Sequence, residues 1–169
     1  MREEDMIIGL TGAQGVGKTT VAKVLEAEAG FVRIGFAAHL RAVCCLIFGC
    51  PPDHFEGTMK DAVCPAWSIT HRHMMQQVGT DVARAVHPDV WVRAWEWTVA
   101  VHNDAVASYW GGQLPSNIVA DDCRFDNEVE AVRRLGGKVV RIKRVGYTAV
   151  RDIHSSEGSL TPSPDAIWR

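Results

Sequence analysis

The chain has 169 residues, a length that favours one domain large enough to bury a hydrophobic core. Hydrophobic residues make up 47% of it and charged residues 22%, an ordinary composition for a globular protein. A net charge of −2 argues against a broad surface for nucleic acid or membrane, so we expect neither as a partner, while small anionic substrates stay compatible.

The cysteines show no metal-binding or disulfide pattern. No C-x-x-C pair occurs and the number of cysteines is odd, so we predict neither a zinc site nor a disulfide framework, and we expect most of them to be packing residues. They are Cys44, Cys45, Cys50, Cys64 and Cys123. The sequence also shows no signal peptide and no apolar run of about 18 residues, so we expect a soluble, cytoplasmic protein.

The predicted elements begin with a buried strand at residues 6–10 and a helix from residue 20, joined by a glycine-rich loop. The loop from Gly12 to Thr19 matches the phosphate-binding pattern G-x-x-x-x-G-K-[ST] in full, in its required strand–loop–helix context. Glycines let the backbone wrap an anion closely, and a helix N-terminus presents unpaired N–H groups to it. The predicted nucleotide-binding residues are Gly12, Ala13, Gly15, Val16, Gly17, Lys18, Thr19 and Thr20.

Two side chains of this loop carry chemistry. Lys18 is expected to reach the β- and γ-phosphates of a nucleotide, which makes it a predicted catalytic residue. The Thr19 hydroxyl is expected to bind Mg²⁺. The loop alone does not separate a kinase from a nucleotide-dependent switch.

Further along, strands and helices alternate. This alternation predicts an α/β fold, a parallel sheet flanked by helices and connected by right-handed crossovers. The predicted strands are 31–36, 117–122 and 138–143; the predicted helices are 37–48, about 70–85, 90–109 and 127–135; and 53–68 is predicted to be an irregular loop.

The strand at 117–122 ends in Asp121 and Asp122. In parallel α/β sheets, ligands bind at the carboxyl ends of the strands, the edge from which the phosphate loop also leaves. An acid at such a strand end commonly holds Mg²⁺, directly or through water, although acids also end strands as plain turn formers. We therefore expect Thr19 and an acid at this strand end to hold the metal.

Five sequence blocks occur in an order and at a spacing that are specific when taken together. They are the phosphate loop; Phe36-Ala-Ala-His-Leu-Arg41; Thr70-His-Arg-His-Met-Met-Gln-Gln-Val-Gly-Thr-Asp81, with Arg84 and Trp91 following; Asp122-Cys-Arg-Phe-Asp-Asn-Glu128; and Asp152-Ile-His-Ser-Ser-Glu157. From residue 7 to about 160 the chain thereby resembles the bacteriophage deoxynucleoside monophosphate kinases, a branch of the P-loop nucleotide kinases.

The resemblance implies a three-layer P-loop kinase domain spanning residues 1–169. Its core is expected at about 6–50 and 115–169, and a helical acceptor-binding region at about 51–112. The implied reaction is Mg²⁺-assisted transfer of the γ-phosphoryl group of ATP to a deoxynucleoside monophosphate, a small-molecule partner. Such a transfer depends on positioning and charge neutralisation more than on covalent chemistry. A phage-encoded enzyme would work in the cytoplasm of its host.

The family-like blocks also suggest the residues for the acceptor, since arginine suits bidentate contacts to phosphate. The predicted substrate-binding residues are Arg41, Arg72, Gln76, Arg84, Trp91, Arg124 and Glu128, and the predicted catalytic residues are Lys18, Asp122 and Arg124. By the same resemblance, Asp122 is expected to orient the acceptor oxygen or the water of Mg²⁺, so the predicted metal ligands are Thr19 and Asp122. For each arginine a solvated ion pair is the alternative, and for Gln76 an exposed position on a helix. Trp91 is the best candidate for stacking on a base, with core packing as the alternative.

Many nucleotide kinases close an arginine-bearing lid over the phosphates to exclude water. Arg144, Arg151, His154 and Glu157 are the lid candidates, because they lie where the family would place such a segment. For His154 and Glu157 a structural hydrogen bond is the alternative.

The chain departs from the family in two places. Relatives more often carry a polar or acidic residue with proline at Ala38 and His39, and lysine at Arg41. Relatives also continue past Arg169 with a strand, an Asn-Asp-Gly turn and a closing helix, so this chain is either naturally short or truncated. If the strand is present and the helix absent, we expect a more open nucleoside pocket, for which a homodimer could substitute as cover. Two other functions stay open: another small-metabolite kinase such as dephospho-coenzyme A kinase, and a non-catalytic ATP-binding switch.

Overall fold

A computed structural model describes residues 6–109, 117–146 and 163–168. The chain forms two compact units. Unit 1 consists of Met1–Phe36 and Val92–Arg169, and unit 2 consists of Ala37–Trp91. The helical region expected at about 51–112 therefore overlaps both units, and its role in binding an acceptor stays a prediction.

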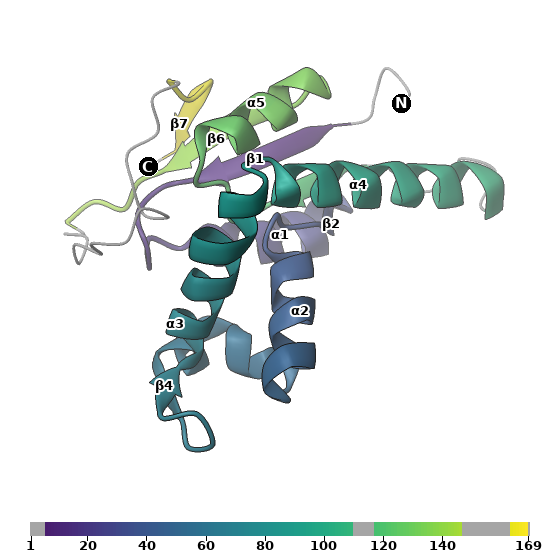
Figure 1. Cartoon of the computed structure of the whole chain (residues 1–169). Helices are drawn as coiled ribbons and strands as arrows, with labels where there is room; N and C mark the ends of the chain where they lie inside the picture. Colours follow the sequence, from purple (N-terminus) through teal and green to yellow (C-terminus); the bar gives the residue numbers. More distant parts are fainter. Residues whose placement is uncertain (1–5, 110–116, 147–162, 169) are drawn as a thin grey trace. The chain divides into compact units, whose positions relative to one another are not determined.

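Within the described residues, unit 1 is built on a five-stranded sheet in the order β2-β5-β1-β6-β7 (Figure 1). Every pairing in it is parallel, which confirms the predicted α/β class. The strands are β1 (Ile7–Thr11), β2 (Val32–Arg33), β5 (Ile118–Ala120), β6 (Lys138–Ile142) and β7 (Ala166–Trp168). Because β1 and β5 are neighbours, the loop after β1 and the acids after β5 leave from the same edge of the sheet.

The side chains of the central strands alternate between two hydrophobic clusters, as the pleat of a strand requires. Ile118 and Ala120 of β5 pack with helices α4 (Val90–Tyr109) and α5 (Asp126–Arg134), whereas Val119 between them packs on the side of α1 (Lys18–Ala29). Helices therefore cover both faces, which gives the three-layer arrangement.

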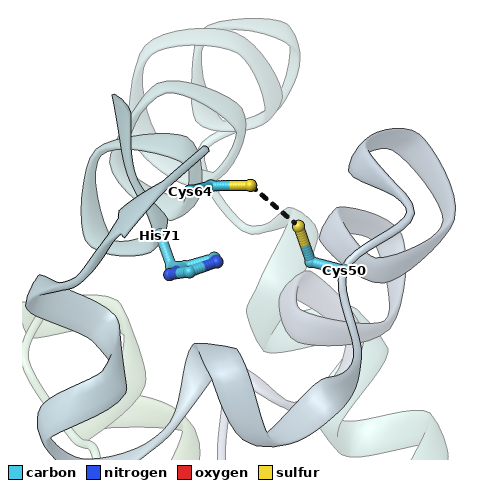
Figure 2. Close-up of side chains that lie close together, drawn as sticks. All are labelled: Cys50, Cys64 and His71. Carbon is cyan, nitrogen blue, oxygen red and sulfur yellow. Dashed lines mark hydrogen bonds between the residues drawn. The ribbon is translucent and has the colours of Figure 1, made fainter. Parts of the chain in front are cut away.

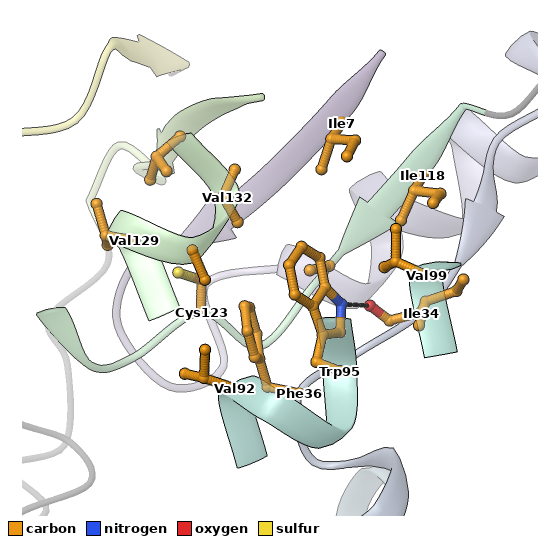
Figure 3. Packing of buried hydrophobic residues seen from close by; sticks show 13 residues of the cluster. Ile7, Ile34, Phe36, Val92, Trp95, Val99, Ile118, Cys123, Val129 and Val132 are labelled. Carbon is orange, nitrogen blue, oxygen red and sulfur yellow. Dashed lines mark hydrogen bonds between the residues drawn. The ribbon is translucent and has the colours of Figure 1, made fainter. Parts of the chain in front are cut away.

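Trp95 is the largest side chain of the first cluster and is 1% exposed. Its ring stacks on Phe36 with centroids 4.5 Å apart, and its Nε1 donates a hydrogen bond of 2.8 Å to the Ile34 carbonyl (Figure 3). A buried indole N–H requires such an acceptor. The contact fixes the segment that follows β2, which then turns toward the end of β5.

Unit 2 is a small helical unit with short irregular elements. Its elements are α2 (Ala38–Phe48), the 3₁₀ turns η1 (Pro52–Phe55) and η2 (Gly57–Asp61), the antiparallel pair β3 (Val63–Cys64) and β4 (Ile69–Thr70), α3 (His71–Gln76) and the π-helical η3 (Gln77–Arg84). The Thr70 hydroxyl caps α3 by accepting from the His73 N–H. A separate core fills this unit, formed by Leu40, Cys44, Cys50, Phe55, Cys64, Met74 and Trp91.

Candidate active site

The loop between β1 and α1 has a backbone that only glycine accommodates at key positions. Gly12 has φ 137°, and a Cβ there would lie 2.5 Å from the Ile142 carbonyl oxygen. Gly17 has φ 109° and forms the N-cap of α1, so the first N–H groups of the helix face the loop. The glycines of the motif are therefore required by the fold of the loop itself.

Lys18 folds back over this loop. Its side chain is 9% exposed, and Nζ donates to the carbonyl oxygens of Gly12 at 2.7 Å and Ala13 at 3.0 Å. A buried ammonium group needs such acceptors, because an unpaired buried charge is costly. The contacts hold a positive charge beside the loop backbone, where an anion attracted by the helix N-terminus would bind.

Thr19 faces a carboxylate from the neighbouring strand. Its Oγ1 donates a hydrogen bond of 2.7 Å to Oδ2 of Asp121, which directly follows β5 and is 7% exposed. The Arg33 guanidinium lies 3.6 Å from the same oxygen. A hydroxyl and a carboxylate are hard oxygen ligands of the kind Mg²⁺ prefers. Asp121 is thus the acid that the structure pairs with Thr19, where the sequence had named Asp122.

Asp122 meets a different part of unit 1. Its Oδ1 accepts a hydrogen bond of 2.8 Å from the Phe36 backbone N–H. A Cβ at Gly35 would lie 2.8 Å from Asp122 Oδ2, so only glycine permits this approach. Asp122 therefore fixes the segment after β2, and its predicted role in catalysis or metal binding stays a prediction.

Glu128 caps helix α5. It is 3% exposed, and its Oε2 accepts from the backbone N–H groups of Arg124 at 2.7 Å and Phe125 at 3.1 Å. This is one half of a capping box, in which an acid at the third helical position closes the helix N-terminus. The cap fixes the backbone that carries the half-buried Arg124 side chain.

Burial, with the nearby Glu128 and Asp122 charges, raises the pKa of the Cys123 thiol well above its ordinary value, so this thiol stays neutral.

The three arginines predicted for the acceptor in unit 2 each contact a protein acceptor. Arg72 forms a bidentate pair with Asp61, with Nε to Oδ1 at 2.6 Å and Nη2 to Oδ2 at 3.2 Å. Arg41 Nε lies 3.7 Å from a Glu56 carboxylate oxygen, and Arg84 Nη1 donates to the Pro88 carbonyl at 3.0 Å. The hydrogen bond from Arg72 lowers the pKa of Asp61 below its usual range.

Trp91 is part of the core of unit 2. Its side chain is 7% exposed, and its Nε1 donates to the Gly79 carbonyl at 2.9 Å. Most of the Trp91 side chain is therefore buried in this core, which favours core packing, the alternative to stacking on a base. Gln76 is half-buried at the end of α3.

Comparisons with known proteins identify the family. A family model described as deoxynucleotide monophosphate kinase matches residues 53–168. A protein of Acanthamoeba polyphaga mimivirus, named "Putative deoxynucleotide monophosphate kinase", is 31% identical over 169 aligned residues, which cover 92% of this chain and 82% of the relative. The chain belongs to the deoxynucleotide monophosphate kinase family. Its members are phosphotransferases, and the viral relative agrees loosely with the expected phage origin.

Most of the lid predicted for this kinase cannot be placed. Arg151, His154 and Glu157 lie outside the described residues, whereas Arg144 is described and exposed after β6. Among the helices that the structure describes, none is long and apolar enough to cross a membrane.

The sequence missed two residues at the phosphate loop of this kinase. Asp121 was seen as one of two strand-end acids, but adjacent acids carry no signal that tells which one faces Thr19. Arg33 lies in no recognised block, and its guanidinium is placed against Asp121 and Glu26, 3.6 Å from a carboxylate oxygen of each. Only the pairing of β2 with β5 brings Arg33 there.

Proposed function

We propose that this kinase transfers the γ-phosphoryl group of ATP, with Mg²⁺ bound, to a deoxynucleoside monophosphate by direct in-line displacement. The observation that carries the proposal is the phosphate loop with the buried Lys18 amine at its backbone and the Thr19–Asp121 pair beside it. Membership of the family supports the phosphotransferase class and the monophosphate acceptor.

On the donor side, the chain provides positive charge and backbone N–H groups. Lys18 exchanges its contacts with the loop carbonyls for oxygens of the β- and γ-phosphates, and the N-terminus of α1 stabilises the same anion. Charge stabilisation of this kind is the main source of rate in phosphoryl transfer.

The Thr19 hydroxyl and the Asp121 carboxylate fit a hard divalent cation, because both are oxygen ligands and they lie 2.7 Å apart. Bound Mg²⁺ would neutralise charge on the phosphates during transfer. The Arg33 guanidinium orients the Asp121 carboxylate through their contact of 3.6 Å.

On the acceptor side, we propose that Arg41, Arg72, Arg84 and Arg124 contribute contacts to the acceptor phosphate, and that Gln76 reads the base or sugar. The Arg72 guanidinium donates two N–H groups to the Asp61 carboxylate, and two oxygens of a phosphate can accept the same pair of hydrogen bonds. Asp122 then orients the attacking oxygen. No general base is required, since a monophosphate is largely ionised near pH 7.

A coupled assay of ADP release tests the proposal, with the common deoxynucleoside monophosphates and dephospho-coenzyme A as acceptors. We expect ADP release that depends on at least one of these monophosphates, and a loss of roughly 10²–10³-fold in kcat for Lys18→Ala. In the same assay, Arg72→Ala should raise KM for the monophosphate by about tenfold or more, while KM for ATP changes little.

Asp61→Asn is the matched control for Arg72→Ala, because it removes the ion pair and keeps the arginine that is proposed to bind the acceptor. A folded protein that binds ATP but responds to no deoxynucleoside monophosphate would contradict the proposal. It would favour the switch function, whereas phosphorylation of dephospho-coenzyme A alone would favour the metabolite kinase.

A further inference from the structure

A buried group of sulfur and nitrogen ligands lies in unit 2, and the proposed phosphoryl transfer does not use it. Cys50, Cys64 and His71 are all buried, and each offers a ligand atom within 4.8 Å of the other two (Figure 2). Cys50 follows α2, Cys64 lies in β3 and His71 begins α3. The fold thus brings three separate segments together at one point.

The two sulfur atoms have the spacing of ligands that share one metal ion. Cys50 Sγ and Cys64 Sγ are 3.6 Å apart. With Zn–S bonds of about 2.3 Å, a tetrahedral zinc site places two sulfurs about 3.8 Å apart. A disulfide would require about 2.05 Å. The observed distance is that of a hydrogen bond between two thiols; it also agrees with the first arrangement and excludes the second.

His71 has a ring nitrogen with a lone pair on the side of the sulfurs, and the same nitrogen contacts His54. Its Nδ1 lies 3.2 Å from the Met59 carbonyl oxygen, which only accepts hydrogen bonds, so Nδ1 carries the proton in that contact. The lone pair of a neutral ring is then on Nε2. A metal-ligating histidine characteristically donates its other N–H to a backbone carbonyl in this way. Figure 2 shows one nitrogen of the ring directed toward the cysteines.

The half-buried His54 lies outside this group of three but contacts His71, which makes it the candidate for a fourth ligand. Its Nδ1 lies 3.2 Å from His71 Nε2. In a tetrahedral site with Zn–N bonds of about 2.0–2.1 Å, two nitrogens lie about 3.3–3.4 Å apart. The sulfur pair and the nitrogen pair therefore both have the lengths of tetrahedron edges.

We propose that Cys50, His54, Cys64 and His71 bind one Zn²⁺ in a closed structural site. Two thiolates balance the charge of the ion, so the burial of the cysteines carries no net charge penalty, and binding releases the two thiol protons. The set contains no oxygen ligand, which disfavours Mg²⁺ and Ca²⁺. Four protein ligands leave no open position, so the ion holds structure and does not take part in catalysis.

This site would stabilise the least regular part of unit 2. The segment between α2 and α3 consists of two 3₁₀ turns and a hairpin of two-residue strands, and small units with such short elements often depend on a metal. The segment carries Asp61, and His71 directly precedes Arg72. Zinc would therefore fix the pair that we assign to the acceptor side.

Metal content tests the proposal without any measurement of activity. Protein purified with Zn²⁺ should carry about one zinc per chain, and Cys50→Ala and Cys64→Ala should carry less than about a tenth of that. Cys44→Ala is the matched control, because Cys44 is a 0% exposed cysteine of the same core that is not a proposed ligand. It should keep the full zinc content.

Cobalt substitution of the wild-type chain guards against variants that do not fold. After removal of metal by a chelator, Co²⁺ should give a thiolate-to-cobalt charge-transfer band and the intense visible bands of a tetrahedral site, and Zn²⁺ should displace it. A wild-type chain that retains no zinc and gives no such spectrum would overturn the proposal. A Cys50–Cys64 disulfide found by mass spectrometry in metal-supplemented protein would overturn it as well.

Discussion

The two adjacent acids at the end of β5, Asp121 and Asp122, make different contacts. Asp121 accepts from the Thr19 hydroxyl beside the phosphate loop, whereas Asp122 accepts from the Phe36 N–H and fixes the segment after β2. The peptide between them turns the two carboxylates toward different neighbours. Proximity in sequence is therefore a poor guide to which of them meets a cation.

This division predicts different responses to Mg²⁺. Asp121→Asn removes the carboxylate charge beside Thr19, so the Mg²⁺ concentration for half-maximal rate should rise by roughly 10–100-fold. Asp122→Asn should leave that concentration near the wild-type value, because its hydrogen bond from Phe36 is kept by the amide oxygen. Titration of Mg²⁺ at saturating ATP measures both. A larger rise for Asp122→Asn than for Asp121→Asn would contradict this and support Asp122 as the ligand.

At the scale of elements, one side chain anchors β7 to the rest of unit 1. Asp165 accepts from the Val139 N–H of β6 at 2.7 Å and from Arg133 of α5 at 2.9 Å. The hydrogen bond from Val139, and then that from Arg133, lower the pKa of Asp165 below its usual range. The ionised carboxylate therefore joins the edge strand to both a neighbouring strand and a helix.

The sign of this shift predicts how stability depends on pH. A carboxyl group with a lowered pKa in the folded state adds stability above its unfolded pKa of about 3.9, and that stability is lost as the pH falls through the folded pKa. Asp165→Ala should therefore reduce the free energy of unfolding by about 1 kcal/mol at pH 7, a small value because the group is partly exposed. Urea unfolding at a series of pH values should show the difference from wild type shrinking in acid. A difference that is constant with pH would contradict the ionic contribution.

The elements also show which local features a sequence pattern can and cannot reveal. Helices α4 and α5 were predictable from their hydrophobic period, and strands β1, β5 and β6 from short apolar runs, as expected of strands in a sheet covered on both faces. β7 has three exposed residues and hence no such period. The predicted helix at 70–85 becomes π-helical at η3, where Gly79 packs so closely on Leu40 that a Cβ would lie 2.5 Å from its Cδ2. That contact comes from another helix and leaves no trace in local periodicity.

For the molecule as a whole, sequence analysis found the motif whose residues are consecutive. It missed the contacts that the fold makes between residues far apart in the chain. The phosphate loop was readable because its residues are consecutive. The Arg33–Asp121 contact and the cluster of Cys50, Cys64 and His71 join segments far apart in the chain. The prediction of no zinc site rested on the absence of a C-x-x-C pair, and the proposed ligands are spaced too widely for that pattern.

The central claim is that the phosphate loop is the donor half of a phosphotransferase and not a nucleotide-dependent switch. Tracing the γ-phosphate of labelled ATP tests it most directly, since the label separates transfer from hydrolysis. We predict that the label appears in a deoxynucleoside diphosphate and that Lys18→Ala lowers this transfer by roughly 10²–10³-fold. Label recovered only as inorganic phosphate, or transfer that Lys18→Ala leaves unchanged, would contradict the claim.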